Sequence, residues 1–84
     1  MLPIQDLLNR IHWDKAFGNA DFVIGYYDRI ENNLVMKPLA EIQFSSENHS
    51  IFEWTDFEGV THSVPFHRIK AVYRNGELIW QRTH

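Results

Sequence analysis

The chain has no cysteine, so neither a disulfide nor a thiolate metal site can stabilise it. It also has no internal repeat, no low-complexity segment and no apolar run long enough to span a bilayer. No basic start leads into an apolar signal region. We therefore expect a soluble, cytoplasmic protein with no membrane partner.

Positive charge is scarce as well: eight Lys and Arg against eleven Asp and Glu give a formal net charge of −3. Proteins that bind duplexes gain affinity by neutralising many phosphates, so this balance argues against a broad polyanion-binding surface. A local site for one or two phosphates remains compatible with it. The 84 residues predict a single small domain over residues 1–84, and an aromatic content of 14% supplies the buried area that a short chain needs.

The strongest structural signal lies in residues 64–82. Asn75-Gly76 stands between two alternating runs, which is typical of a two-residue type I′ hairpin turn. Folding about this turn predicts the cross-strand pairs Arg74–Glu77, Tyr73–Leu78, Ala71–Trp80 and Ile69–Arg82. Opposed residues share a face, so the predicted core face holds Ile69, Ala71, Tyr73, Leu78 and Trp80. The other face is at least partly solvated and holds Lys70, Val72, Arg74, Glu77, Ile79 and Gln81.

The rest of the chain predicts one helix followed by strands. Apolar residues at helical spacing predict a helix over residues 3–12, with Trp13 after its end; they are Ile4, Leu7, Leu8 and Ile11. Alternating runs predict strands that precede the hairpin at 21–28, 34–37, 51–55 and 60–64, with a bulge or close backbone approach at Gly25. Residues 39–42 fit either one helical turn or an irregular crossing, residues 45–50 a loop, and Thr83-His84 a free tail.

A helix before strands, without alternation of the two, predicts the α+β class. We expect one N-terminal helix packed on a strongly bent antiparallel sheet of about six short strands, with closure into a small barrel as one arrangement. Trp54 and Trp80 are expected in the core.

The segment from Pro65 to Arg68 is the first candidate for a binding site. Proline lacks an N–H and fixes φ, so the preceding strand should end there and leave His67 and Arg68 in a corner between two strands. Two cationic donors on such a corner suit an anion, above all a phosphate. The alternative is that Arg68 pairs with an acidic residue and His67 is half-buried.

Other basic and aromatic residues stand at strand or helix ends. Arg29 ends one strand and Arg82 ends the last. Trp13, at the helix end, is either a stacking platform that closes over the corner or a core residue that fixes the helix to the sheet.

The five histidines do not predict a metal site. His62 and His67 are separated by Pro65, and no third ligand stands at suitable spacing, so we expect no metal or other cofactor. His49 and His62 are each followed at once by Ser, with Ile51 and Val64 two positions on. This differs from the paired His-x-Ser/Thr elements of two-histidine phosphoesterases. Hydrolysis is therefore not expected.

Four segments resemble, in order, those of a family of small archaeal and bacterial proteins, the RNA cyclic group end recognition domain. They are residues 7–14 (LLNRIHWD), 27–29 (YDR), 65–69 (PFHRI) and 75–82 (NGELIWQR). The resemblance implies a role in binding RNA ends that bear a cyclic phosphate, alongside RNA-repair or RNA-processing enzymes. Carried over by residue, it implies a site at Asp28, Arg29, His67, Arg68, Arg82 and Trp13.

Three functions follow from these patterns. The leading one is a non-catalytic module for processed RNA 3′ ends, in particular 2′,3′-cyclic phosphates. In it Tyr27 or Trp13 stacks on the terminal base, and Asp28 orients Arg29 or accepts a hydrogen bond from a neighbouring ribose hydroxyl. The second is a protein-interaction module that docks a partner along residues 51–54 or the terminal strand. The third, a phosphoesterase using His67, is the least supported.

Overall fold

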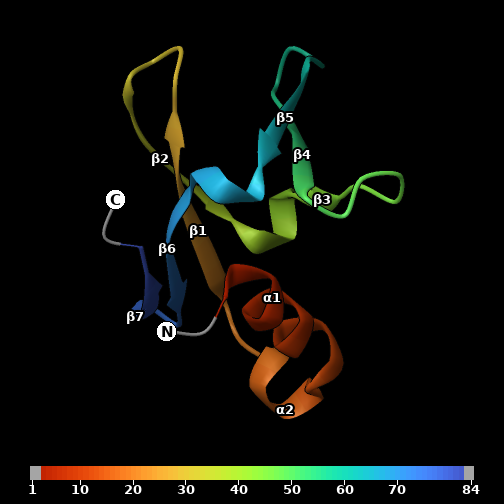
Figure 1. Cartoon of the computed structure of the whole chain (residues 1–84), viewed down its shortest axis with the longest axis vertical. Coiled ribbons are helices and arrows are strands. Elements are labelled where there is room, and N and C mark those ends of the chain that lie inside the picture. The colour runs from red at the N-terminus through yellow and green to blue at the C-terminus, as the bar shows by residue number, and fades with distance from the viewer. Residues whose placement is uncertain (1–2, 83–84) are drawn as a thin grey trace.

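The computed structural model describes residues 3–82, and the predicted tail Thr83-His84 lies outside them. It contains helices α1 (Ile4–Trp13) and α2 (Lys15–Gly18) and the 3-10 turns η1 (Leu39–Glu41) and η2 (Phe66–Arg68) (Figure 1). The strands are β1 (Phe22–Asp28), β2 (Asn33–Pro38), β3 (Gln43–Phe44), β4 (Ile51–Thr55), β5 (Thr61–Pro65), β6 (Ile69–Arg74) and β7 (Glu77–Gln81). All strand pairs are antiparallel, so the predicted α+β class is confirmed.

The strands form two sheets, which do not close into a barrel within residues 3–82. The larger has the order β2-β1-β6-β7 and the smaller the order β3-β4-β5. The turn η2 joins β5 of one sheet to β6 of the other, so the predicted corner lies where the chain crosses between sheets (Figure 1). β4 is the central strand of its sheet, which is why residues 51–54 do not form the docking edge considered above. β7 is an edge strand of the larger sheet.

Helix α1 buries the stripe that its sequence predicts. Ile4, Leu7 and Leu8 are buried, and Ile11 packs against the core. Trp13 is the last residue of the helix rather than the residue after it. Immediately after it, the Asp14 side chain accepts a hydrogen bond of 3.1 Å from the backbone N–H of Phe17 and so begins α2.

The β6–β7 hairpin has the predicted turn. Asn75 and Gly76 have φ values of 50° and 84°, as a type I′ turn requires. The two pairs next to the turn, Arg74–Glu77 and Tyr73–Leu78, are also as predicted.

Beyond these pairs the register shifts by one residue. Trp80 pairs with Val72 and Ala71 with Gln81, so Ile79 is the extra residue of a bulge. The predicted pairs of Trp80 with Ala71 and of Arg82 with Ile69 are therefore wrong. Val72 becomes fully buried, whereas Leu78 on the predicted core face is 44% exposed.

The core lies between the two sheets and α1. Its fully buried large side chains are Phe52, Ile24, Ile69 and Val72. Trp80 is buried as predicted, whereas Trp54 is half-buried and packs against the core. The fold thus buries most of its apolar side chains between the sheets and α1 and leaves the β1–β2 and β4–β5 turns exposed.

Gly25 shows both features that its position in a strand predicts. The β1–β6 register shifts between Gly25 and Tyr26, because Lys70 is an extra residue on β6. A Cβ atom at Gly25 would also lie 2.8 Å from the sulfur of Met36. Only glycine fits this approach without displacing that side chain.

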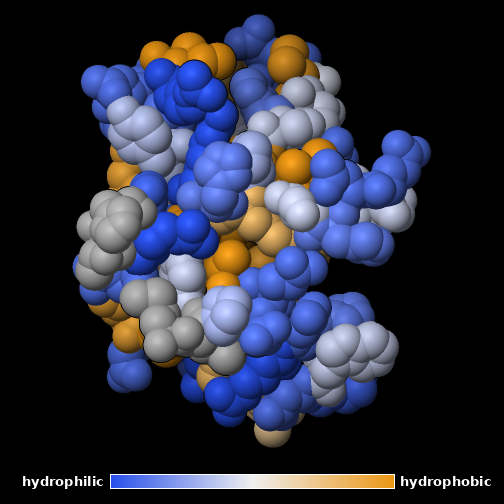
Figure 2. Space-filling model, viewed as in Figure 1, coloured by the Kyte–Doolittle hydropathy of each residue, from blue (hydrophilic) through white to orange (hydrophobic). Residues whose placement is uncertain are grey.

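One face of the molecule is mostly hydrophilic. Figure 2 shows apolar atoms at the far ends of the β1–β2 and β4–β5 hairpins and in a central hollow. The most exposed large apolar residues are Ile30 in the β1–β2 turn, at 93%, and Phe57 in the β4–β5 turn, at 98%.

Candidate functional site

The basic side chains divide into two sets. In the first set each cationic group lies 3.9–5.2 Å from the centre of an aromatic ring; the residues are Arg10, Lys37, Arg74 and Arg82. Within residues 3–82, the second set makes no side-chain hydrogen bond, ion pair or ring contact; it comprises Lys15, Arg29, Arg68 and Lys70. The second set is free to bind a ligand.

Three of these four free cations converge on one hollow. Its volume is about 330 Å³, and its lining consists of Tyr27, Arg29, His67, Arg68 and Lys70. No acidic side chain lines it. Despite the net charge of −3, the hollow is a concentrated positive site. We call it the cationic hollow.

Strand pairing explains why residues far apart in sequence meet there. β1 and β6 are antiparallel neighbours, and Tyr26 at the end of β1 pairs with Ile69 at the start of β6. Arg29 directly follows β1, and η2 directly precedes β6. Lys70 is the extra residue of the bulge opposite Gly25, and a bulge redirects the side chain that it carries.

The lining residues differ in how firmly they are held. Arg29 and His67 are exposed, whereas Arg68 and Lys70 are half-buried. The Tyr27 hydroxyl donates a hydrogen bond to Oδ1 of Asn32, across the β1–β2 turn. Tyr27 therefore gives the hollow a fixed aromatic wall beside cations that are free to adapt to a ligand.

Asp28 shapes the turn that carries Arg29. Its Oδ1 accepts hydrogen bonds from the backbone N–H groups of Ile30, at 2.9 Å, and Glu31, at 3.2 Å. This is the usual way in which an aspartate stabilises a turn. Asp28 makes no ion pair with Arg29, so it positions that residue through the backbone rather than by pairing with it.

Besides Asp28, which shapes the adjoining turn, two predicted site residues do not line the cationic hollow. Trp13 is 76% exposed and contacts the edge of the His12 ring, so it is neither a core residue nor part of the hollow. Arg82 is half-buried over the ring of Trp80. Its backbone N–H donates to the carbonyl of Lys70 at 2.8 Å. Arg82 thus supports the strand that carries Lys70 instead of lining the hollow.

Lys70 is the lining residue that sequence reasoning did not select. The pattern placed it only on the solvated face of the hairpin. Strand alternation gave no signal for it, because Arg68 lies in the turn η2 and Lys70 is the extra residue of a bulge.

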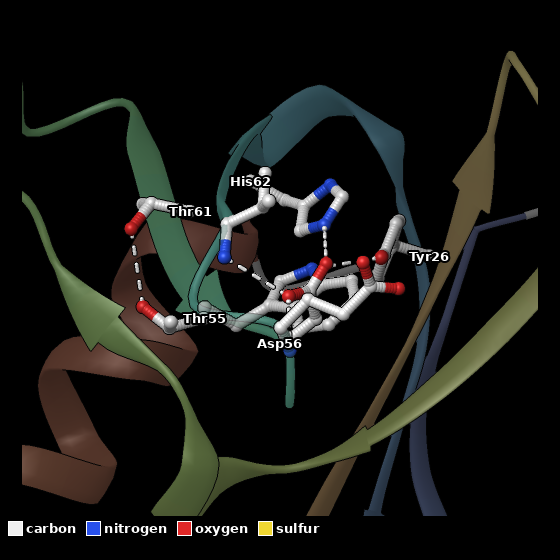
Figure 3. A network of polar contacts seen from close by, with 8 residues as sticks. Tyr26, Thr55, Asp56, Thr61 and His62 are labelled. Atoms are coloured by element: carbon white, nitrogen blue, oxygen red, sulfur yellow. Dashed lines mark hydrogen bonds and ion pairs between the residues drawn. The ribbon is translucent and has the colours of Figure 1, made fainter.

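A second polar group lies on the smaller sheet (Figure 3). His62 Nε2 lies 2.9 Å from Oδ2 of Asp56, and the His62 ring stacks on Trp54 with centroids 4.3 Å apart. Trp54 Nε1 donates to the Tyr26 hydroxyl at 2.9 Å. Burial raises the pKa of Tyr26, which keeps this hydroxyl protonated. The hydrogen bond from His62, with support from the backbone N–H of Val60, lowers the pKa of Asp56.

Two further features are absent from residues 3–82. No group of three or more His, Cys, Asp or Glu side chains is arranged to hold a metal ion there. In the same residues, no helix has both the length and the apolar character needed to cross a membrane.

Comparison with known proteins places the chain among relatives. A UPF0248 protein of Methanococcus maripaludis strain C5 is 27% identical over 82 residues, which cover 94% of this chain and 97% of the relative. A UPF0248 protein of strain C6 is 30% identical with the same coverage. No solved structure gives a significant match. The sequence profile of the MJ1316 RNA cyclic group end recognition domain matches residues 1–82, and the chain belongs to this family.

Proposed function

We propose that this chain is a non-catalytic module that binds processed RNA 3′ ends and holds a terminal 2′,3′-cyclic phosphate in the cationic hollow. Arg68 and Lys70 contact the phosphate, and Arg29 and His67 close over it from the exposed side. The observation that carries the proposal is the convergence of three unpaired cations with His67 and Tyr27 in one hollow.

The charge of the ligand suits a small site. A cyclic phosphodiester carries one negative charge, which a few local cations can match without a basic surface. Guanidinium groups bind phosphate oxygens through paired N–H donors, and such charged hydrogen bonds are stronger than neutral ones. The family is named for recognition of RNA cyclic ends, and this name supports the same ligand.

The wall of the hollow offers a contact for the terminal nucleoside. RNA is commonly recognised at single-stranded ends whose bases stack on aromatic side chains. Tyr27 is half-buried and lines the hollow, so its ring is the proposed stacking surface for the terminal base. Trp13 has no part in this proposal because it lies outside the hollow.

An NMR titration tests the ligand. Three short RNAs of one sequence would end in a 2′,3′-cyclic phosphate, a 3′-phosphate or a 3′-hydroxyl. We expect the cyclic end to bind most tightly and to shift the amide signals of His67, Arg68 and Lys70. Equal affinity for all three ends would contradict the recognition of a cyclic phosphate.

A matched pair of variants tests the site. Arg68→Ala should weaken binding of the cyclic end by about 1.5–3 kcal/mol, the usual value of a hydrogen bond to a charged group. Lys15→Ala removes the same charge from a free lysine that lies outside the hollow, and should leave affinity unchanged. Comparable losses in both variants would indicate general electrostatic attraction instead of a specific site.

The proposal assigns recognition, not hydrolysis, to His67. Within residues 3–82, the His67 side chain makes no hydrogen bond or ion pair, so no described partner orients it as a general base. RNA-repair or RNA-processing enzymes are the proposed partners that act on the bound end. Incubation of the cyclic-ended RNA with the protein should return it unchanged.

A further inference from the structure

A second hollow adjoins the cationic hollow and shares Arg68 with it. Its volume is about 300 Å³. One wall consists of Tyr26 and Asp28 of β1 with Ile30 of the β1–β2 turn, and the other consists of residues 61–64 of β5. Because Arg68 lines both hollows, a chain whose end lies in the first can continue into the second.

The β5 wall presents backbone groups that form no hydrogen bond within residues 3–82. β5 is an edge strand, with β4 as its neighbour in the sheet. Asp56 N–H donates to the carbonyl of Val60, and Phe66 N–H donates to that of Ser50. In an antiparallel ladder, hydrogen-bonded pairs alternate with pairs that are not hydrogen-bonded. Val60 and Phe66 belong to hydrogen-bonded pairs, so Thr61 and Ser63 belong to the other kind, and their N–H and C=O groups point away from β4. They point out of the open edge, where those residues line the second hollow.

His62 is held in place within the same wall. Its Nε2 lies 2.9 Å from Asp56 Oδ2 (Figure 3). Its ring also stacks on that of Trp54. These contacts occupy one ring nitrogen and leave Nδ1 without a hydrogen bond inside residues 3–82. An imidazole oriented in this way offers a ligand a single polar atom at a fixed position.

Asp28 supplies an acceptor on the opposite wall. Its Oδ1 is occupied by the N–H groups of the β1–β2 turn. Its Oδ2 accepts no hydrogen bond from any residue between 3 and 82. A ribose 2′-hydroxyl is a suitable donor for such an oxygen, and this hydroxyl distinguishes RNA from DNA.

We infer that the second hollow binds the nucleotide that precedes the RNA end, so that the protein reads a terminal dinucleotide. In this arrangement Arg68, which lines both hollows, contacts the linkage between the two nucleotides as well as the cyclic phosphate. The free edge of β5 contacts the penultimate nucleoside. Asp28 accepts a hydrogen bond from the 2′-hydroxyl of that nucleoside. The inference rests on the proposed function and extends it by one subsite.

The chemistry of a cyclic end gives this subsite a specific role. In a 2′,3′-cyclic phosphate the 2′ oxygen of the last ribose is bonded to phosphorus and cannot donate a hydrogen bond. The first free 2′-hydroxyl therefore belongs to the preceding nucleotide. A protein that contacts this hydroxyl must bind at least two nucleotides.

Three ligands test the inference: a 2′,3′-cyclic mononucleotide, a dinucleotide with the same cyclic end, and that dinucleotide with a 2′-deoxy first ribose. We expect the dinucleotide to bind about tenfold more tightly than the mononucleotide, as a few added hydrogen bonds allow. It should also shift the amide signals of Thr61 and Ser63. The deoxy dinucleotide should lose several-fold of this gain.

A pair of histidine variants adds a site-specific control. His62→Ala should remove most of the dinucleotide's advantage and leave mononucleotide affinity unchanged. His49→Ala alters a histidine that lines a different hollow, beside α1, and should change neither affinity. The amide shifts of the unmodified protein give a readout that does not depend on whether His62→Ala folds.

The outcomes separate the two proposals. If the mononucleotide and the dinucleotide bind equally and the Thr61 and Ser63 amides do not shift, the second subsite is wrong while the proposed function stands. If neither the mononucleotide nor the dinucleotide binds, the proposed function is wrong, and the second subsite is wrong as well. Binding of an extended peptide along β5, with no dinucleotide response there, would also overturn the inference.

Discussion

Arg68 immediately precedes strand β6 and Arg74 is its last residue, and the two side chains differ in their contacts. Arg74 Nε donates a hydrogen bond of 3.0 Å to the backbone carbonyl of Phe17, and the Arg74 guanidinium lies 5.0 Å from the centre of the Phe17 ring. Arg68 makes no side-chain hydrogen bond, ion pair or ring contact within residues 3–82. One end of the strand thus uses arginine to hold the helices to the sheet, and the other keeps arginine free.

This difference shows why net charge is a poor guide to the ligand of this protein. Four basic residues are committed to aromatic rings and cannot contribute fully to binding. Three of the remaining cations lie together, so they repel one another in the absence of a ligand. An anion between them relieves that repulsion. Local arrangement, and not the total of −3, decides what the surface attracts.

The largest expected effect belongs to the structural part of the molecule. Trp80→Ala should destabilise the domain by about 3–5 kcal/mol, because Trp80 is only 7% exposed and its truncation leaves a cavity. A domain of this size has little more stability than that to lose. Chemical denaturation followed by circular dichroism measures the change.

Leu78→Ala is the control for Trp80→Ala. Leu78 is on the predicted core face of the hairpin, but it is 44% exposed. We expect Leu78→Ala to lower the stability of the domain clearly less than Trp80→Ala does, since less apolar area is lost from the interior. Equal losses in the two variants would mean that the bulge at Ile79 does not form in solution.

A reciprocal pair of variants sharpens the comparison between the two ends of β6. Arg74→Ala should cost about 1–2 kcal/mol of stability through the lost hydrogen bond and ring contact, and leave RNA affinity unchanged. Arg29→Ala should show the reverse, with stability within about 0.5 kcal/mol of the parent and weaker binding of cyclic-ended RNA. Measuring both quantities for both variants separates structural from binding arginines. Loss of RNA affinity in Arg74→Ala but not in Arg29→Ala would mean that Arg74, and not Arg29, is the binding arginine.

The dependence of affinity on salt tests how local the site is. Contact with one or two phosphates releases one or two counterions, so the logarithm of affinity should fall against the logarithm of salt concentration with a slope of about −1 for single-stranded RNA. Extending the RNA beyond a few nucleotides should add little affinity. A slope of about −4, with affinity rising steadily with length, would indicate a general single-strand binder.

Sequence predicted the parts of the fold that depend on neighbouring residues. The type I′ turn follows from Asn75-Gly76, because these residues tolerate positive φ, and the α1 stripe follows from helical spacing. The bulge at Ile79 was not predictable in this way. It depends on how Val72 and Trp80 pack together across the hairpin, which local propensity does not determine.

The candidate site was predictable in part for the same reason. Arg29, His67 and Arg68 could be selected because strand ends and proline-bounded corners expose their residues. Lys70 was missed because its direction depends on a bulge opposite Gly25. Arg82 and Trp13 do not line the cationic hollow, since a one-residue shift in the hairpin moved the first and no local signal fixed the direction of the second.

The smallest expected effect concerns the Asp56–His62 pair of the smaller sheet. The hydrogen bond from His62, together with that from the backbone of Val60, lowers the pKa of Asp56 below its value in the unfolded chain, about 3.9. A carboxylate with a lowered pKa stabilises the fold fully above the unfolded value, and this contribution is lost as pH falls through the folded pKa. Asp56→Asn retains an acceptor for the turn but has no carboxylate for His62. We therefore expect its melting temperature to lie slightly below that of the parent at pH 5–6 and to converge with it as pH falls through the folded pKa of Asp56, which lies below about 3.9. A difference that stayed constant from pH 6 to pH 2 would show that the charge of Asp56 does not contribute.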